Sequence, residues 1–197
     1  AVCQGWTDSN GKFSLTMPLS YDVSNYSIKT YGGTDSFYGK NFDNISFATL
    51  PLSNYVNHLD ILVTPITSLQ KGLVDIGLDV DSANTIIEKY LKITKDKVLK
   101  DPESDDLLLK VAYNINKIAM AKGGNNPFKE IASSLNKNKL SLNDSKVLSS
   151  IFGENSPTIS EILSSYNNIM SLSSSREVLK NDIYKDLNSG RIKWDEV

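Results

Sequence analysis

The first third of the chain, to about residue 63, alternates apolar and polar positions. Phe13, Leu15 and Met17 are separated by polar residues, and the same period of two returns at Tyr26 and Ile28. Successive side chains of a strand point to opposite faces of a sheet, so this alternation is typical of half-buried strands. The pattern predicts short strands over about residues 12–17, 26–30, 45–47 and 58–63.

At Thr64 the period changes, and apolar residues begin to recur every three or four positions. Thr64 is a favoured helix N-cap and Pro65 suits the first helical position, so together they predict a helix start. Further amphipathic stripes follow, and we expect Ser82 to cap the second helix and Asn143 or Asp144 the fifth. The stripes predict helices over about residues 65–76, 83–91, 103–122, 128–135, 145–152, 158–170 and 179–187.

Together these patterns predict an α+β fold, with a short antiparallel β portion at the N-terminus followed by a multi-helix bundle. Each helix has one apolar face that needs a partner, and a bundle buries all of them economically. Residues 1–63 are expected to form the β-rich portion, part of a larger β-domain, because so few strands leave sheet edges open. Residues 64–197 are expected to form the helical body, with a break near 123–127, where Gly123-Gly124 stops a helix.

The composition argues against two classes of function. The chain has 21 Lys and Arg against 23 Asp and Glu, a net charge of −2, and so lacks the cationic excess of a generic nucleic-acid binder. No apolar run approaches the ~20 residues that cross a bilayer, so the chain is not expected to span a membrane. Cys3 is the single cysteine and cannot form an internal disulfide. It is either a buried thiol or, as in lipoproteins, a lipid-anchored residue.

Three short motifs resemble elements of bacterial surface proteins. Residues 7–15, TDSNGKFSL, resemble a hairpin of immunoglobulin-like and carboxypeptidase-regulatory-like domains. Residues 32–35, GGTD, and residues 62–69, LVTPITSL, resemble a turn and a helix start that follow in many bacterial surface proteins and lipoproteins. The resemblance covers about residues 5–123. It implies export, with an extracellular, cell-surface or periplasmic location in a bacterium, and a structural, adhesive or binding role.

Candidate catalytic and metal-binding residues are few. His58 is the only histidine and is accompanied by a single cysteine, too few for a catalytic triad or for most zinc sites. Asp79 and Asp81 begin like an EF-hand calcium loop, but positions six and twelve would be Asn84 and Tyr90 instead of Gly and Glu. Turn formation and helix capping explain this cluster better, and a calcium site of another kind is left open. We expect no enzymatic activity and no cofactor.

The stretch after the second predicted strand is rich in turn residues and aromatics. Tyr31, Phe37 and Tyr38 lie there beside Asn and Asp residues, and these three are candidate ligand-binding residues for a sugar or a peptide. The alternative is that the rings fill the loop itself. The preferred hypothesis is a non-enzymatic extracellular or cell-surface module with a structural, adhesive or interaction role and a protein or glycan partner. The alternative is a ligand-binding domain of a bacterial lipoprotein, with a pocket where the strands meet the helices.

Overall fold

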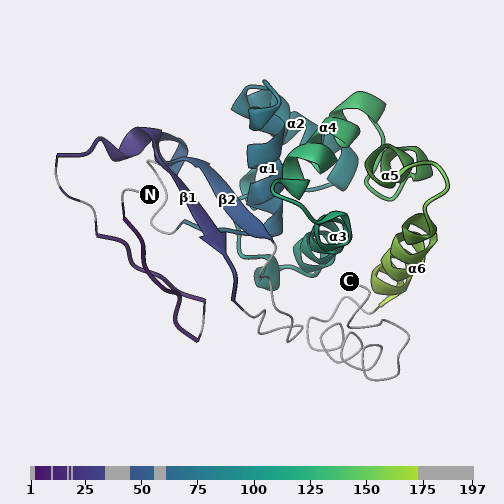
Figure 1. Cartoon of the computed structure of the whole chain (residues 1–197), viewed down its shortest axis with the longest axis horizontal. Helices are drawn as coiled ribbons and strands as arrows, with labels where there is room; N and C mark the ends of the chain where they lie inside the picture. Colours follow the sequence, from purple (N-terminus) through teal and green to yellow (C-terminus); the bar gives the residue numbers. More distant parts are fainter. Residues whose placement is uncertain are drawn as a thin grey trace.

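The computed structural model describes residues 3–9, 11–16, 18, 20–33, 45–55 and 61–172. In these residues a two-stranded antiparallel sheet precedes six α-helices (Figure 1), which confirms the predicted α+β fold. The strands are β1 (Ser27–Tyr31) and β2 (Ser46–Pro51). The helices are α1 (Pro65–Asp75), α2 (Val80–Leu91), α3 (Asp106–Lys122), α4 (Pro127–Asn138), α5 (Ser145–Phe152) and α6 (Pro157–Ser171).

The segment before β1 folds back on itself at a tight turn. The backbone N–H of Asp8 donates to the carbonyl of Lys12 at 2.8 Å, and the Asp8 carboxylate accepts the N–H of Lys12 at 2.9 Å. Gly11 has a φ of 72°, which glycine adopts without steric cost. The two arms then face each other, since a Cβ added to Gly5 would lie 3.1 Å from Cδ2 of Leu15.

The strand predicted over residues 12–17 is wrong for residues 12–16, which form no strand; Met17 lies outside the described residues. The alternation of exposure is nevertheless present, because Phe13 and Leu15 are half-buried between exposed neighbours. Alternation decides which side chains face the protein. A strand also needs an adjacent backbone in register with it, and a one-dimensional pattern does not supply that.

The strands predicted around residues 26–30 and 45–47 are confirmed as β1 and β2. They pair antiparallel, with Lys29 opposite Ala48 and an irregularity in the register nearer the start of β1. The fourth predicted strand, over 58–63, is absent at residues 61–63, and residues 58–60 lie outside the described part.

A serine of α1 joins the sheet to the helices. The backbone N–H of Ala48 in β2 donates to Ser68 Oγ at 3.0 Å, and the Ser68 hydroxyl donates to the Thr64 carbonyl at 2.7 Å. This hydroxyl therefore satisfies a backbone group on the side of β2 that faces α1, where a further strand would otherwise pair.

The predicted start of α1 is confirmed in detail. Thr64 and Thr67 form a reciprocal capping box, in which the Thr67 N–H donates to Thr64 Oγ1 at 3.1 Å and the Thr64 N–H donates to Thr67 Oγ1 at 2.9 Å. Pro65 occupies the first turn, where its missing N–H costs nothing. The helix ends before Gly77, whose φ is 100°.

Two other helix starts differ from the prediction. Asp79, not Ser82, caps α2, and its carboxylate accepts the Ser82 N–H at 2.7 Å. The helix α3 begins at Asp106, slightly later than predicted, because Asp105 caps it after a short 3₁₀ turn. A carboxylate that accepts backbone N–H groups is a strong cap, and its charge complements the helix dipole. For α5 the predicted cap at Asp144 is confirmed.

Helix α1 lies between the sheet and α4 (Figure 1). A Cβ added to Gly72 would lie 2.6 Å from the carbonyl oxygen of Phe128, so α1 and α4 approach closely at this glycine. The Phe128 ring also packs against Phe47 of β2, with the ring centroids 5.5 Å apart. The contact between the helices therefore extends to the sheet.

Helix α3 is buried on most of its circumference. One cluster of buried apolar side chains extends from Ile45, just before β2, to Ile162 in α6. The division of the chain into residues 1–63 and 64–197, with a break near 123–127, stays a prediction. The helix predicted over 179–187 lies outside the described residues.

Candidate functional site

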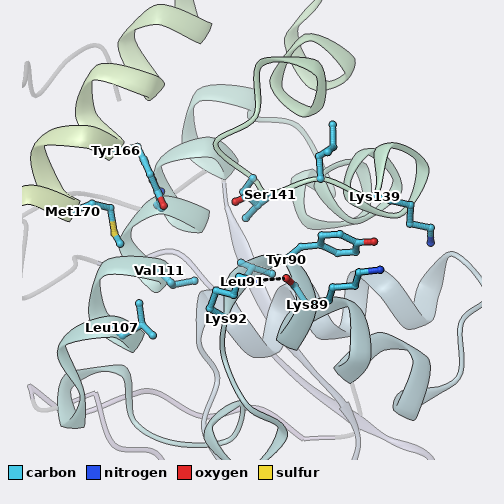
Figure 2. A pocket seen from close by; sticks show the side chains of 13 residues that line it. Lys89, Tyr90, Leu91, Lys92, Leu107, Val111, Lys139, Ser141, Tyr166 and Met170 are labelled. Atoms are coloured by element: carbon cyan, nitrogen blue, oxygen red, sulfur yellow. Dashed lines mark hydrogen bonds between the residues drawn. The ribbon is translucent and has the colours of Figure 1, made fainter.

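A pocket of about 480 Å³, which we call the helical groove, opens among α2, α3, α6 and the connection between α4 and α5 (Figure 2). Its volume is within the range of roughly 300–1,000 Å³ found for small-molecule sites. None of the described strand residues lines it, so this pocket is not at the strand–helix junction where the sequence predicted one. The lining residues are Lys89, Tyr90, Leu91, Lys92, Leu107, Val111, Asn114, Lys139, Leu140, Ser141, Leu142, Tyr166 and Met170.

One end of the helical groove is apolar. Leu107 and Val111 are one turn apart on α3, and Tyr166 and Met170 are one turn apart on α6. Residues four apart lie on the same helix face, and Figure 2 shows the four side chains gathered at one end. Burial raises the pKa of the Tyr166 hydroxyl above its ordinary value of 10.0, so this hydroxyl stays neutral near pH 7.

The opposite end of the helical groove is cationic. Figure 2 shows Lys89, Tyr90 and Lys139 at this end, and the Lys89 ammonium is 5.3 Å from the centroid of the Tyr90 ring. Lys92 also lines the groove, and its ammonium donates to the Lys89 carbonyl at 3.0 Å. Among the residues that the structure describes, the lining contains no aspartate or glutamate, so positive charge dominates this end.

The three groove lysines form no ion pair with a described carboxylate, a property that they share with other described lysines such as Lys29 and Lys146. Five lysines elsewhere are paired with carboxylates: Lys71, Lys95, Lys97, Lys100 and Lys122. Among the residues that the structure describes, Lys89, Lys92 and Lys139 have no carboxylate partner. Their charges are therefore left available to an anion from outside the chain.

Two of these lysines occupy an unfavourable backbone conformation. Lys92 and Lys139 end α2 and α4 with φ of 63° and 56°, and in the described ranges they are the non-glycine residues with positive φ. Left-handed backbone costs an ordinary residue roughly 1–2 kcal/mol, and helices commonly place glycine there. Local strain of this kind is frequent at functional sites.

Asn114 of α3 lines the helical groove, and its side chain carries a polar atom that is buried in the protein. Its side chain is 5% exposed, and its Oδ1 has no hydrogen-bond partner among the described residues. An unsatisfied buried acceptor costs about 1–3 kcal/mol.

Of the predicted ligand-binding residues, Tyr31 alone falls in the described part of the chain. It ends β1, its side chain is 79% exposed, and it lies outside the helical groove. Phe37, Tyr38 and His58 lie outside the described residues. Whether the three aromatics form one site therefore stays a prediction.

The acidic residues considered for calcium have structural partners. Asp79 caps α2, and its hydrogen bonds to Ser82 hold the pKa of its carboxyl below the ordinary value of 3.8. Asp81 accepts a hydrogen bond from the Lys95 ammonium at 2.6 Å. Within the described ranges, no three His, Cys, Asp or Glu side chains are grouped to hold a metal ion.

Comparison with known proteins gives no relative. No family model, no curated protein and no solved structure matches this chain. The resemblance of residues 5–123 to bacterial surface proteins therefore stays a prediction. Over the described residues, no helix has both the length and the apolar character needed to cross a membrane.

The sequence analysis did not predict the helical groove, although two unusual features of its lining residues are visible in the sequence. Asn114 interrupts the apolar stripe of α3 between Val111 and Ile115. Lys92 and Lys139 stand where glycine commonly ends a helix. Neither feature indicates which other elements line the groove, because only the packing of the helices brings α2, α3 and α6 together.

Proposed function

We propose that this protein is a non-enzymatic binding module that holds a small ligand in the helical groove. The observation that carries this proposal is the two-ended lining of the groove, with apolar side chains of α3 and α6 at one end and Lys89 and Lys139 at the other. Leu107 and Val111 of α3 give the first end an apolar wall. A ligand with an apolar body and a polar head suits both kinds of lining.

The composition of the lining supports binding rather than catalysis. Among the described residues, the lining includes no aspartate, glutamate, histidine or cysteine, side chains that often act as general bases or nucleophiles. Apolar walls with a small number of polar groups are typical of small-molecule sites, in which the polar groups fix the orientation of the ligand.

A binding screen with a blocked groove tests this function. Small apolar and amphiphilic compounds are screened by thermal shift, and hits are measured by isothermal titration calorimetry. Leu107→Trp fills the apolar end of the groove and is expected to abolish binding of the hits. Ser164→Trp places the same ring on the exposed face of α6, outside the lining, and is expected to leave binding unchanged. Hits that bind Leu107→Trp as well as the wild type would contradict the proposal.

A second candidate function, adhesion to a protein or glycan, has support from the N-terminal segment, which comprises the described residues within 3–33. The large apolar side chains exposed in the described residues all lie there: Trp6, Tyr21, Tyr26 and Tyr31. Trp6 is 95% exposed. Exposed aromatic rings provide contact area for sugars and for protein partners.

A glycan array and a surface-protein panel test this second function. We expect the double variant Trp6→Ala/Tyr31→Ala to lose any signal that the wild type gives, because both exposed rings are removed. Leu107→Trp is the control, since it alters the helical groove and leaves the N-terminal aromatics in place. A signal that survives the double variant would assign the partner to another surface.

The location proposed with either function is outside the cytoplasm, as the resemblance of residues 5–123 implies. In a bacterial host, protease added to intact cells should degrade the protein if it is displayed on the surface. A protein that is released only with the cytoplasmic fraction would contradict this location.

A further inference from the structure

We propose that the ligand of the helical groove is an amphipathic anion, with an apolar chain and a carboxylate or phosphate head group. This inference rests on the proposed binding function and specifies its ligand. The groove is polarised: Leu107, Val111 and Met170 lie at one end, and Lys89 and Lys139 lie at the other (Figure 2).

The apolar end of the groove favours a ligand that has an apolar hydrocarbon chain. Side chains from α3 and α6 meet there, and the neutral Tyr166 hydroxyl adds a polar tip to an otherwise apolar wall. Each methylene removed from water strengthens binding about fourfold. A ligand without an apolar segment would leave this wall in contact with water, and its affinity would lack the contribution of buried methylenes.

The cationic end sets the requirement for an anion. Lys89 and Lys139 lie at this end, and Lys92 lies nearer the middle (Figure 2). All three come from the ends of α2 and α4, and no carboxylate of the described residues lines the groove with them. Part of their role is to complement the helix dipoles, as when Lys92 bonds the Lys89 carbonyl. Dipole compensation alone does not require three cations around one pocket in a chain whose net charge is −2.

The use of lysine rather than arginine bears on the head group. An ammonium is a compact point charge without the planar fork of a guanidinium, so it accepts anions of different shape. Carboxylate and phosphate are therefore both compatible with the groove.

The test uses amphiphiles that share one chain and differ in the head group, each kept below its aggregation concentration. Decanoate, decyl phosphate, 1-decanol and decyltrimethylammonium are titrated into the protein by calorimetry. We expect the two anions to bind at least about tenfold more tightly than the alcohol, and the cation to bind most weakly. The stronger of the two anions identifies the head group. Octanoate, shorter by two methylenes, should bind about 15-fold more weakly than decanoate.

Variants separate the charge from the apolar wall. The double variant Lys89→Gln/Lys139→Gln should weaken decanoate binding about tenfold and leave 1-decanol binding unchanged. Lys129→Gln, on an exposed part of α4 outside the groove, removes the same charge and should change neither. Amide chemical shifts of residues 89–92 and 139–142, measured in the wild type, report independently whether the ligand occupies the groove.

The outcomes distinguish this inference from the function on which it rests. Equal affinity for decanoate and 1-decanol, with no effect of the double variant, would overturn the anion inference and leave a binding groove. Absence of binding by all the amphiphiles to folded wild-type protein would overturn the anion inference, while the wider compound screen decides the binding function. Binding that shifts no amide at residues 89–92 or 139–142 would place the ligand elsewhere and overturn both.

Discussion

The N-terminal segment, residues 3–33 with its gaps, and the described part of the helical body, residues 64–172, bury their apolar side chains very differently. In the helical body, Leu69, Leu73 and Ile115 are 0% exposed. In the N-terminal segment, Trp6 and Tyr31 are largely exposed. Both regions have regular hydrophobic patterns in the sequence, so the pattern alone does not decide how much apolar surface is buried.

The difference follows from where each type of element finds its hydrogen bonds. A helix satisfies its backbone internally, so its apolar stripe needs only another apolar surface. A strand needs a second backbone in register before its face can be buried. β2 has such a partner in β1, and on its other side the Ser68 hydroxyl of α1 accepts the hydrogen bond of the Ala48 N–H. Residues 12–16 form no strand, and their alternation leads only to half-burial.

The largest expected effect compares one leucine from each region. Leu69→Ala should lower the free energy of unfolding by about 3 kcal/mol, because it leaves a cavity in the core. Leu15→Ala should lower it by less than about 1 kcal/mol, since Leu15 is only half-buried. Urea denaturation gives both values. Equal losses for the two variants would show that the N-terminal segment is as well packed as the helical body.

Gly72→Ala tests the close approach of α1 to α4. Alanine in a helix normally gains about 1 kcal/mol over glycine, but here the added methyl would lie 2.6 Å from the Phe128 carbonyl oxygen. We expect a net loss of about 2 kcal/mol from overpacking. Gly77→Ala is the control, with no atom within 4 Å of the added methyl and a φ of 100°, so it should cost about 1 kcal/mol from backbone strain alone. A stabilised Gly72→Ala variant would contradict this close packing.

Ser68→Ala tests the bond between the two regions. The substitution leaves the Ala48 N–H without its acceptor, which should cost about 1–2 kcal/mol. Hydrogen exchange should accelerate at Ala48 more than at Leu73, which lies deeper in α1. Unchanged protection at Ala48 would mean that β2 does not depend on α1 for this bond.

The smallest effect concerns Asp105, which caps α3. Its hydrogen bond to the Lys97 ammonium is the main cause that lowers the pKa of its carboxyl below the ordinary 3.8, and the N–H groups of Leu107 and Leu108 add to it. Because the pKa of the Asp105 carboxyl is lower in the folded than in the unfolded protein, the charged carboxylate stabilises the fold at any pH above the unfolded-state pKa. This stabilisation is lost as the pH falls through the folded-state pKa. Asp105→Asn keeps a capping oxygen and removes the charge.

We therefore expect Asp105→Asn to be less stable than the wild type by about 0.5 kcal/mol near pH 7, since the ion pair is partly exposed. The difference should begin to shrink as the pH falls below about 4, where the carboxyl of the unfolded chain takes up a proton, and should vanish below the lowered pKa of the folded protein. Urea denaturation at several pH values measures it. A difference that does not depend on pH would show that the charge contributes nothing and that only the shape of the cap matters.

Much of the helical body could be predicted from the sequence because the signals are local. Thr64-Pro65, the stripe after it and Gly77 define α1 within one stretch of chain, and the structure confirms them. The error at Ser82 was also local: Asp79 offered a charged acceptor at a suitable distance before the same helix. The failure at residues 12–16 was different in kind, because strand formation depends on a partner that the local pattern does not specify.

The sequence by itself determined the change from strands to helices, the turn at Gly11, the break after β1 at Gly32-Gly33 and most helix ends, since each depends on neighbouring residues and on backbone geometry. Only the tertiary structure decided that α1 lies between the sheet and α4, and that Asn114 meets Lys89, Lys139 and Tyr166 around one groove. These residues come from four separate segments. Their meeting depends on how amphipathic faces interlock, a property of the packed helices rather than of any one stretch of chain.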